Sequence, residues 1–289
     1  MMMIASELRR AIDTAAAVLA EAGIDSARWD AEELAAHLAG SDRGRLPLLD
    51  PSDKDFFGRY RAIVTERARR VPLQHLTGTV DFGPVKLRVG PGVFIPRPET
   101  EAMLEWATAQ DRSLFPAQPL IVDVCTGTGA LALALLRHWP TARVLGIDDS
   151  EAALAYARQN SAGSAVELVR ADVTAPGVLA ELDGHVDLVV ANPPYIPDGT
   201  ELEPEVSQYD PQRAVFGGPD GMTVITAIVG LAGRWLRPGG LFAVEHDEST
   251  SQLTVELVTD TGLFDDIMAR TDLTGRPRFV TARRRGDEA

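Results

Sequence analysis

Residues 120–129 have the sequence LIVDVCTGTG, an apolar run followed by two closely spaced glycines. The run Leu120–Val124 has the length and composition of a buried strand, and a helical pattern extends from Gly129 to Arg137. Glycines allow a ligand to approach the backbone closely, and the first turn of a helix offers free N–H groups. The sequence therefore predicts a strand, a ligand-binding turn and a helix in succession.

Strand and helix patterns continue to alternate after this point. Further strands are expected at Arg143–Ile147, Val166–Arg170, Val186–Ala191, Leu241–Glu245 and Arg278–Ala282. Helices are expected at Ser150–Asn160, Met222–Leu236 and Ser249–Thr261. Such alternation is typical of an α/β fold with a parallel sheet and helices on both faces.

The N-terminal quarter of the chain is predicted to be a bundle of helices. Apolar residues recur every three or four positions over residues 4–22. A second helix, capped by Asp25 or Ser26, is expected to direct Trp29 inward, and a third is expected to start at Asp50-Pro51-Ser52.

The pattern changes over residues 76–95, where Gly and Pro surround the alternating run Val85–Val89. This pattern indicates a β-hairpin. A length of 289 residues is compatible with two domains. We therefore divide the chain into a helical bundle at 1–75, the hairpin at 76–95 and an α/β domain at 96–289.

Composition restricts the class of protein. Hydrophobic residues make up 45% and charged residues 24% of the chain, which is ordinary for a globular protein and excludes a disordered one. No apolar run approaches the roughly 18 residues of a membrane helix. The single cysteine, Cys125, excludes an internal disulfide and a Cys-rich zinc cluster. The histidines lack ligand spacing, so we expect no metal. The lack of a long apolar run and the single cysteine lead us to expect no membrane association and a cytoplasmic location.

The distribution of charge argues against a nucleic-acid partner. The formal net charge is −14. Residues 1–75 hold 12 acidic and 11 basic residues, whereas residues 76–289 hold 30 and 17. Proteins that grip a phosphate backbone generally have a basic face, so we expect no direct nucleic-acid binding.

An acidic residue follows the glycine turn at a distance typical of nucleoside binding. Asp148 lies at the end of the second predicted strand, 19 residues after Gly129. A carboxylate there can accept hydrogen bonds from both ribose hydroxyls. The third glycine of a pyrophosphate loop is replaced by Ala132, so NAD remains possible but S-adenosylmethionine, which has no phosphates, fits better. The expected cofactor contacts are Asp123, Cys125, Thr126, Gly127, Thr128, Gly129, Asp148, Asp172, Val173 and Asn192.

A second candidate site follows the predicted strand Val186–Ala191, which runs directly into Asn192-Pro193-Pro194-Tyr195. Two prolines fix two φ angles and make the turn rigid. The Asn192 oxygen and the Pro193 carbonyl are two acceptors for the two hydrogens of a planar –NH2 group, and Tyr195 offers an aromatic wall. An ordinary Asn-Pro turn is the alternative, but the position at the carboxyl end of a strand favours a ligand site.

These motifs resemble those of a known family. The run Asn192–Tyr195 is similar to the signature of methyltransferases that act on amide or exocyclic amino nitrogen. Nearly the whole chain resembles the release-factor glutamine methyltransferases (PrmC/HemK). The shared motifs are PLQHLTG at 72–78, FIPRPETE at 94–101, GTGALA at 127–132, NPPYIP at 192–197, EPEV at 203–206 and GPDG at 218–221.

The resemblance implies a Rossmann-like fold with a mostly parallel seven-stranded sheet. It also implies methyl transfer from S-adenosylmethionine to the amide nitrogen (N5) of the glutamine in the Gly-Gly-Gln motif of peptide chain release factors. Asn192, Pro193 and Tyr195 would be catalytic. Phe94, Asn192, Pro193, Pro194 and Tyr195 would bind the substrate glutamine. The bundle would recognise the body of the release factor, and the protein would be a monomer.

Two other functions are compatible with parts of this pattern. Adenine-N6 and guanine-N2 methyltransferases of DNA or RNA share the Asn-Pro-Pro-Tyr run, but the acidic composition argues against them. An adenosine-binding regulatory module would leave the run at 192–195 unexplained.

The chain departs from the family at two places. Cys125 stands where the family usually has glycine, and we interpret it as a small loop residue rather than a nucleophile. Glu245-His246-Asp247 stands where the family tends to have a glycine in third place. We interpret His246 and Asp247 as surface residues at the end of a strand.

Overall fold

The computed structural model describes residues 2–49 and 55–286, so the predicted helix start at Asp50-Pro51-Ser52 lies outside the described residues. The chain forms two compact units. The first comprises Met1–Thr79 and Leu202–Tyr209, and the second comprises Val80–Glu201 and Asp210–Ala289. No helix in the described part of the chain is long and apolar enough to span a membrane.

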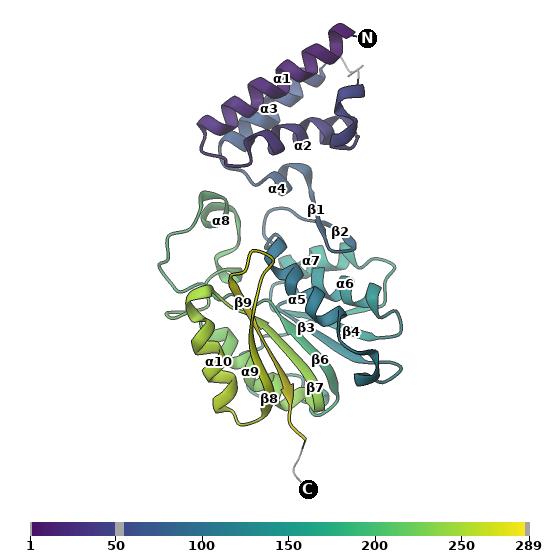
Figure 1. Ribbon diagram of the computed structural model, residues 1–289, viewed down its shortest axis with the longest axis vertical. Helices are drawn as coiled ribbons and strands as arrows, with labels where there is room; N and C mark the ends of the chain where they lie inside the picture. Colours follow the sequence, from purple (N-terminus) through teal and green to yellow (C-terminus); the bar gives the residue numbers. More distant parts are fainter. Residues whose placement is uncertain (1, 50–54, 287–289) are drawn as a thin grey trace. The chain divides into compact units, whose positions relative to one another are not determined.

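The first unit is a helical bundle that also includes one segment from later in the chain (Figure 1). Its N-terminal elements are α1 (Met2–Glu21), α2 (Ala27–Ala39), the 3-10 helix η1 (Arg43–Leu48), α3 (Phe56–Ala68) and α4 (Leu73–Thr77). The apolar sides of these helices bury Leu19, Leu34 and Phe56. The predicted inward position of Trp29 is wrong: the residue is 51% exposed, and one face of its ring is covered by the Arg43 guanidinium.

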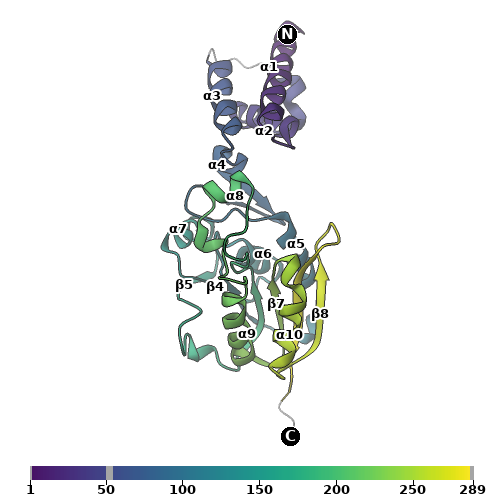
Figure 2. The same cartoon turned by 90° about the vertical axis from the view of Figure 1, so that its left-hand side faces the viewer.

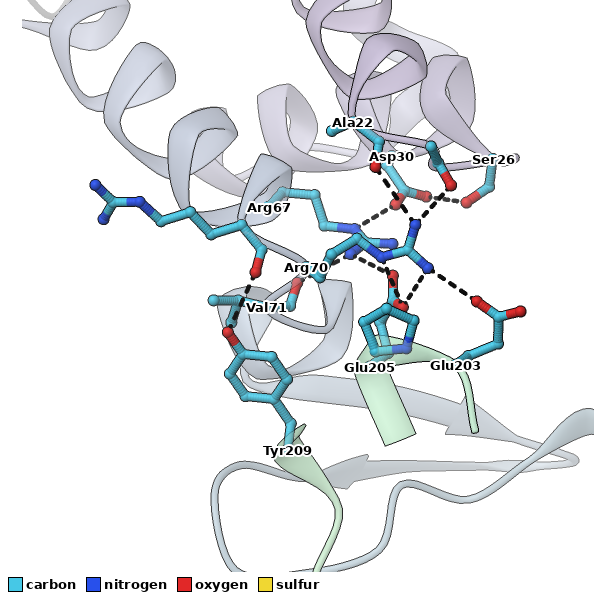
Figure 3. Close-up of polar contacts among 12 residues, drawn as sticks. Ala22, Ser26, Asp30, Arg67, Arg70, Val71, Glu203, Glu205 and Tyr209 are labelled. Atoms are coloured by element: carbon cyan, nitrogen blue, oxygen red, sulfur yellow. Dashed lines mark hydrogen bonds and ion pairs between the residues drawn. The ribbon is translucent and has the colours of Figure 1, made fainter. Parts of the chain in front are cut away.

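This later segment contains α8 (Pro204–Tyr209), and ion pairs hold it within the first unit. Glu205 accepts from Arg67 Nη1 at 2.9 Å and from Arg70 Nη2 at 2.6 Å (Figure 3). Arg67 also donates to Asp30 at 2.7 Å. The chain therefore leaves the second unit shortly after the Asn192–Tyr195 run and is anchored on the bundle before it returns at Asp210.

The second unit contains a seven-stranded sheet, which confirms the predicted fold class. Its strand order is β5-β4-β3-β6-β7-β9-β8. All neighbouring pairs are parallel except β7 with β9 and β9 with β8. The strands are β3 (Leu120–Val124), β4 (Arg143–Asp148), β5 (Val166–Arg170), β6 (Val186–Ala191), β7 (Leu236–Glu245), β8 (Phe264–Thr271) and β9 (Pro277–Arg284). Strands β1 (Thr79–Phe82) and β2 (Val85–Arg88) form a separate two-stranded sheet.

Helices cover both faces of the large sheet (Figure 1 and Figure 2). The helices of this unit are α5 (Pro98–Thr108), α6 (Ala130–His138), α7 (Glu151–Asn160), α9 (Thr223–Trp235) and α10 (Ser251–Asp260). Successive residues of the central strands point to opposite faces. Val189 and Ala191 of β6 pack in the core under α9 and α10, whereas Leu188 and Val190 pack in the core under α5 and α6.

Two strands differ from the sequence prediction. β7 begins at Leu236 instead of Leu241, so it includes Pro238 and Gly239, which are typical of a turn. β8 was not predicted, because it lacks an alternating pattern: most of its side chains are exposed, and Asp266 has a φ of 52° next to a register shift. Such a bulge at a sheet edge interrupts the two-residue period on which strand prediction depends.

Candidate active site

The predicted ligand residues meet at the carboxyl ends of β3, β4 and β6. Val124 of β3 is paired with Ile147 of β4 on one side and with Ala191 of β6 on the other. The chain runs from β3 outward to β4 and β5 and then returns to β6, so this is the topological switch point at which ligands bind. The residues that follow these three strands are therefore brought together by the sheet itself.

A cavity opens at this edge and is lined by most of the predicted residues. They are Phe94, Asp123, Cys125, Thr126, Gly127, Thr128, Asp148, Asp172, Val173, Asn192 and Pro194. Gly129, Pro193 and Tyr195 do not line it. Gly129 instead has a φ of 84° and caps the N-terminus of α6. Arg213, Asp149 and Thr100, which the sequence analysis did not single out, also line the cavity.

Asp148 has the geometry of a ribose acceptor. Its Oδ2 accepts from Gly127 N at 2.9 Å and its Oδ1 from Ser150 N at 2.8 Å. Each carboxylate oxygen has a second lone pair, which remains available to a ligand hydroxyl. Burial raises the pKa of Asp148 in spite of these two backbone N–H groups. The two contacts hold the carboxylate against the glycine turn.

Asp123 is buried and only partly satisfied. Its Oδ2 accepts from Thr126 Oγ1 at 2.6 Å and from Ala132 N at 3.0 Å. Its Oδ1 is buried and has no hydrogen-bond partner within residues 2–49 and 55–286. Burial raises the pKa of Asp123 to about 7. An unpartnered carboxylate oxygen at the wall of a cavity suits a ligand ammonium group.

The glycine turn contains one strained residue. Cys125 has a φ of 59°, in the left-handed region that side chains rarely adopt and glycine adopts freely. Gly127 has a φ of 55°. A glycine at position 125 would adopt this conformation without strain. Burial raises the pKa of the Cys125 thiol well above its ordinary value, so the thiolate is scarce at neutral pH.

Asp172 and Val173 line the cavity beyond the end of β5. Asp172 Oδ1 accepts from Thr174 N at 2.8 Å and from Thr174 Oγ1 at 2.6 Å. These hydrogen bonds lower the pKa of Asp172 and keep its carboxylate ionised. Val173 is buried and supplies an apolar surface on which a flat ring can pack.

The Asn192–Tyr195 loop is supported from behind by two glycines. A Cβ at Gly217 would lie 2.5 Å from the Pro194 carbonyl oxygen. A Cβ at Gly221, whose φ is 75°, would overlap the Tyr195 carbonyl. Gly217 and Gly221, the second of which ends the GPDG run, therefore let the backbone approach the loop as closely as it does.

Asn192 is held by a chain of hydrogen bonds. Its Nδ2 donates to Thr100 Oγ1 at 2.9 Å, and Thr100 Oγ1 donates to Glu245 Oε2 at 2.8 Å. The Tyr195 hydroxyl donates to Glu245 Oε1 at 2.9 Å. Burial raises the pKa of Glu245 to about 7. Thr100 and Glu245 lie within the motifs quoted above but were not expected at the site, since nothing in their spacing shows that they meet.

The cavity wall at Phe94 is braced by Arg97. The Arg97 guanidinium lies 4.9 Å from the centre of the Phe94 ring. It also donates to Asp210 Oδ2 at 2.5 Å, and the Asp210 side chain is fully buried. The position of Phe94 is thus tied to the point at which the chain re-enters this unit.

The interpretation of His246 as a surface residue is wrong. Its side chain is fully buried, and its backbone N–H donates to Arg278 O at 2.9 Å. β7 lies between β6 and β9, so the residue after its last paired position remains covered. Burial lowers the pKa of His246, which favours the neutral ring. Asp247 is half-buried and accepts from Ser249 N at 2.9 Å.

The described residues offer no obvious metal site, since residues 2–49 and 55–286 contain no group of three or more His, Cys, Asp and Glu placed to hold an ion. The residues present do fit a nucleoside with an amino-acid side arm. Asp148 can accept from a ribose, the Asp123 oxygen from an ammonium group, and Val173 can pack against a base.

Two family models match parts of the chain. Residues 10–78 match the family model "PrmC N-terminal domain" and residues 121–202 match "Methyltransferase domain". The chain is 71% identical to the release factor glutamine methyltransferase of Mycobacterium tuberculosis (strain H37Rv), over 96% of this chain and 92% of that one. It is 45% identical to the protein of the same name from Streptomyces coelicolor, over 92% and 94% of the two chains.

A more distant relative of the same name, from Deinococcus radiodurans, is 38% identical over 97% of this chain and 99% of that one. Among solved structures, the ribosomal protein L11 methylase of Lactobacillus delbrueckii subsp. bulgaricus aligns with 69% of this chain and 86% of its own. The TM-score is 0.46 and the identity 22%.

Proposed function

The chain belongs to the release factor glutamine methyltransferases, and on this premise we propose that it methylates the side-chain amide nitrogen of the glutamine in the Gly-Gly-Gln motif of peptide chain release factors. Identities of 38–71% over nearly the full length support this assignment. The observation that carries it is the position of Asn192 at the end of β6, on the wall of the cavity formed with β3 and β4.

We propose S-adenosylmethionine as the cofactor. When bound, it supplies an electrophilic methyl group carried on a sulfonium. Asp148 would accept from its ribose hydroxyls and Asp123 Oδ1 from its ammonium group. Asp172 and Val173 would contact the adenine side, and the turn at 125–129 would lie against the rest of the ligand.

Asn192 and Pro193 would hold the substrate nitrogen. The lone pair of an amide nitrogen is delocalised into its carbonyl, so the nitrogen attacks only when it is held in line at short distance. Two acceptors would fix both hydrogens of the –NH2 group: the Asn192 Oδ1, from a residue on the cavity wall, and the Pro193 carbonyl, from the next residue, which does not itself line the cavity. They would also stabilise the positive charge that develops on the nitrogen during transfer.

Phe94 and Pro194 would form the walls beside the substrate amide, since both line the cavity. The aromatic wall expected from Tyr195 needs revision. The Tyr195 side chain does not line the cavity, and its hydroxyl donates to the buried Glu245. We therefore assign Tyr195 to fixing the loop that carries Asn192 and Pro193.

The test is a methyl-transfer assay with purified full-length protein and methyl-labelled cofactor. We expect label in an intact release factor and none in a variant factor whose motif glutamine is replaced by glutamate. Duplex DNA and ribosomal RNA should remain unlabelled. Transfer to either nucleic acid, with none to the release factor, would favour the adenine or guanine methyltransferase alternative.

Asn192→Ala should abolish most turnover while the affinity for S-adenosylhomocysteine changes by less than a few fold. The reason is that Asn192 acts on the substrate nitrogen, where its contact is worth most in the transition state. Turnover is measured with release factor and affinity by calorimetry. Asp198→Ala, an exposed change in the same loop, is the matched control and should leave both unaltered. Full activity of Asn192→Ala would exclude the assigned role.

A further inference from the structure

We propose that Thr100 and Glu245 are positioning residues that fix the orientation of the Asn192 amide, so that its oxygen and not its –NH2 group faces the substrate. This inference rests on the proposed function. The three residues form what we call the Glu245–Thr100–Asn192 chain, joined by hydrogen bonds of 2.8 and 2.9 Å.

The direction of this chain follows from which groups can donate. Both oxygens of Glu245 meet a hydroxyl, and in its ionised form the carboxylate can only accept, so in that form the Thr100 hydroxyl must give its single hydrogen to Glu245. Thr100 Oγ1 then has only lone pairs left for Asn192. The group of Asn192 that meets it must be the donor, Nδ2. The orientation of the Asn192 amide is thus set by Glu245, to which it is linked by two successive hydrogen bonds through Thr100.

The chain is shielded from solvent at its inner end. Thr100 is 4% exposed and Glu245 is 1% exposed. The second oxygen of Glu245 is occupied by the Tyr195 hydroxyl at 2.9 Å. Tyr195 and Asn192 belong to the same rigid loop, so one buried carboxylate holds that loop both directly and through Thr100. Leaving a buried acceptor without a donor costs free energy, so this arrangement is favoured over one in which Glu245 lacks a hydrogen bond.

The consequence concerns the substrate amide. If the Asn192 amide turned by about 180°, its –NH2 would face the –NH2 of the glutamine, donor against donor. The substrate nitrogen would lose one of its two acceptors. Binding of the cofactor at Asp148 and Asp123 would be unaffected, since neither residue takes part in the chain. The loss would therefore fall on transfer rather than on cofactor affinity.

The test compares Thr100→Val, which keeps the shape of the side chain and removes the hydroxyl, with Thr100→Ser, which keeps the hydroxyl. For Thr100→Val we expect kcat on the release factor to fall tenfold or more. Its KM and its dissociation constant for S-adenosylhomocysteine should stay within about threefold of wild type. Thr100→Ser should recover at least a third of the wild-type kcat.

Two results would overturn the positioning role. One is wild-type kcat in Thr100→Val. The other is an equal loss in Thr100→Ser, or a loss in Thr100→Val that is accompanied by weaker cofactor binding, since these indicate a merely structural role. Wild-type protein is assayed in parallel: if it does not methylate the release factor at all, the proposed function itself fails.

A double-mutant cycle with Glu245→Gln provides a second measurement. A glutamine amide can donate to Thr100 as well as accept from it, so the direction of the chain is no longer fixed. Glu245→Gln should lower kcat, and the double variant Thr100→Val/Glu245→Gln should be no worse than Thr100→Val alone. Multiplicative losses in kcat would show that the two residues act independently and would contradict the chain.

Discussion

Asp123 and Glu245 are both buried carboxylates of the active-site unit, and burial raises the pKa of each to about 7. Their surroundings nevertheless assign them different tasks. Both oxygens of Glu245 accept from side-chain hydroxyls of the protein, whereas Asp123 keeps one oxygen without a partner among the described residues. Glu245 is therefore suited to hold the protein's own loop, and Asp123 to receive a ligand.

The open oxygen of Asp123 predicts that cofactor affinity depends on pH. A ligand ammonium group favours the ionised carboxylate, so binding lowers the pKa of Asp123 from about 7 and releases a proton. Affinity for S-adenosylhomocysteine should therefore rise from pH 6 to pH 8, by about tenfold for this single group. Calorimetry in two buffers of different ionisation enthalpy measures both the affinity and the proton release.

Asp123→Asn is the control for that measurement, since it cannot release the proton and should flatten the profile. Unchanged affinity and no proton release in the wild-type protein would show that Asp123 does not meet the ammonium group.

Asp148→Ala should weaken cofactor binding. Losing a charged acceptor of two ribose hydroxyls costs about 1.5–3 kcal/mol, which is roughly ten- to a hundredfold in the dissociation constant. Calorimetric titration with S-adenosylhomocysteine measures the change. Glu151→Ala is the matched control and should bind as wild type does. It removes an exposed carboxylate of α7, the helix that follows Asp148, where Glu151 is paired with Arg158. Wild-type affinity in Asp148→Ala would show that another group contacts the ribose.

At the scale of elements, the segment that carries α8 is anchored by charge. The Arg67 and Asp30 side chains are 7% and 3% exposed, and Glu205 is 19% exposed (Figure 3). Burial alone would raise the pKa of Glu205, but its hydrogen bonds from Arg67 and Arg70 outweigh burial and lower it. The stability contributed by Glu205 is therefore present at neutral pH and is lost as the pH falls through its lowered pKa.

Glu205→Gln should destabilise the first unit by about 2 kcal/mol or more, because Arg67 and Arg70 then lose the negatively charged acceptor that they share. Urea unfolding measures the free energy of unfolding, and limited proteolysis within residues 196–212 reports release of the segment. Glu66→Gln, which breaks an exposed pair with Arg69, should change the free energy of unfolding by less than about 0.5 kcal/mol. Equal effects of the two substitutions would mean that Glu205 does not anchor α8.

At the scale of the whole molecule, we propose that the two units perform different tasks. Every residue that lines the cavity lies within 80–201 or 210–289. A single glutamine side chain offers too little surface for selection of a protein substrate, which requires on the order of 1,000 Å² of contact. We propose that the bundle, which matches the PrmC N-terminal domain, recognises the body of the release factor.

Removal of residues 1–75 should therefore raise the KM for intact release factor strongly and leave the affinity for S-adenosylhomocysteine largely intact. The truncated protein should also carry Glu203→Gln and Glu205→Gln, because it lacks Arg67 and Arg70, which hold those carboxylates. Kinetics are compared after circular dichroism has verified folding. A short Gly-Gly-Gln peptide is the control and should be a poor substrate for both forms. Wild-type kcat/KM of the truncated form on the intact factor would exclude recognition by the bundle.

The sequence alone was enough to predict six of the seven strands of the sheet and the place of the cavity. β3 and β6 begin and end at the predicted residues, because buried strands between turns produce continuous apolar runs. β5, a partly exposed strand at the edge of the sheet, also has the predicted bounds. Residues after parallel strands meet at one edge, so the gathering of Asp123, Asp148 and Asn192 around a cavity followed from their order along the chain.

Other features depended on contacts between distant parts of the chain. Thr100 is 92 residues from Asn192 and 145 from Glu245, and α8 is held by arginines more than 130 residues before it. Periodicity and turn residues report only on neighbours along the chain, so they carry no signal for such pairs. The sequence thus determined which residues gather at the cavity, whereas the direction of the Asn192 amide was decided only when folding buried a carboxylate behind it.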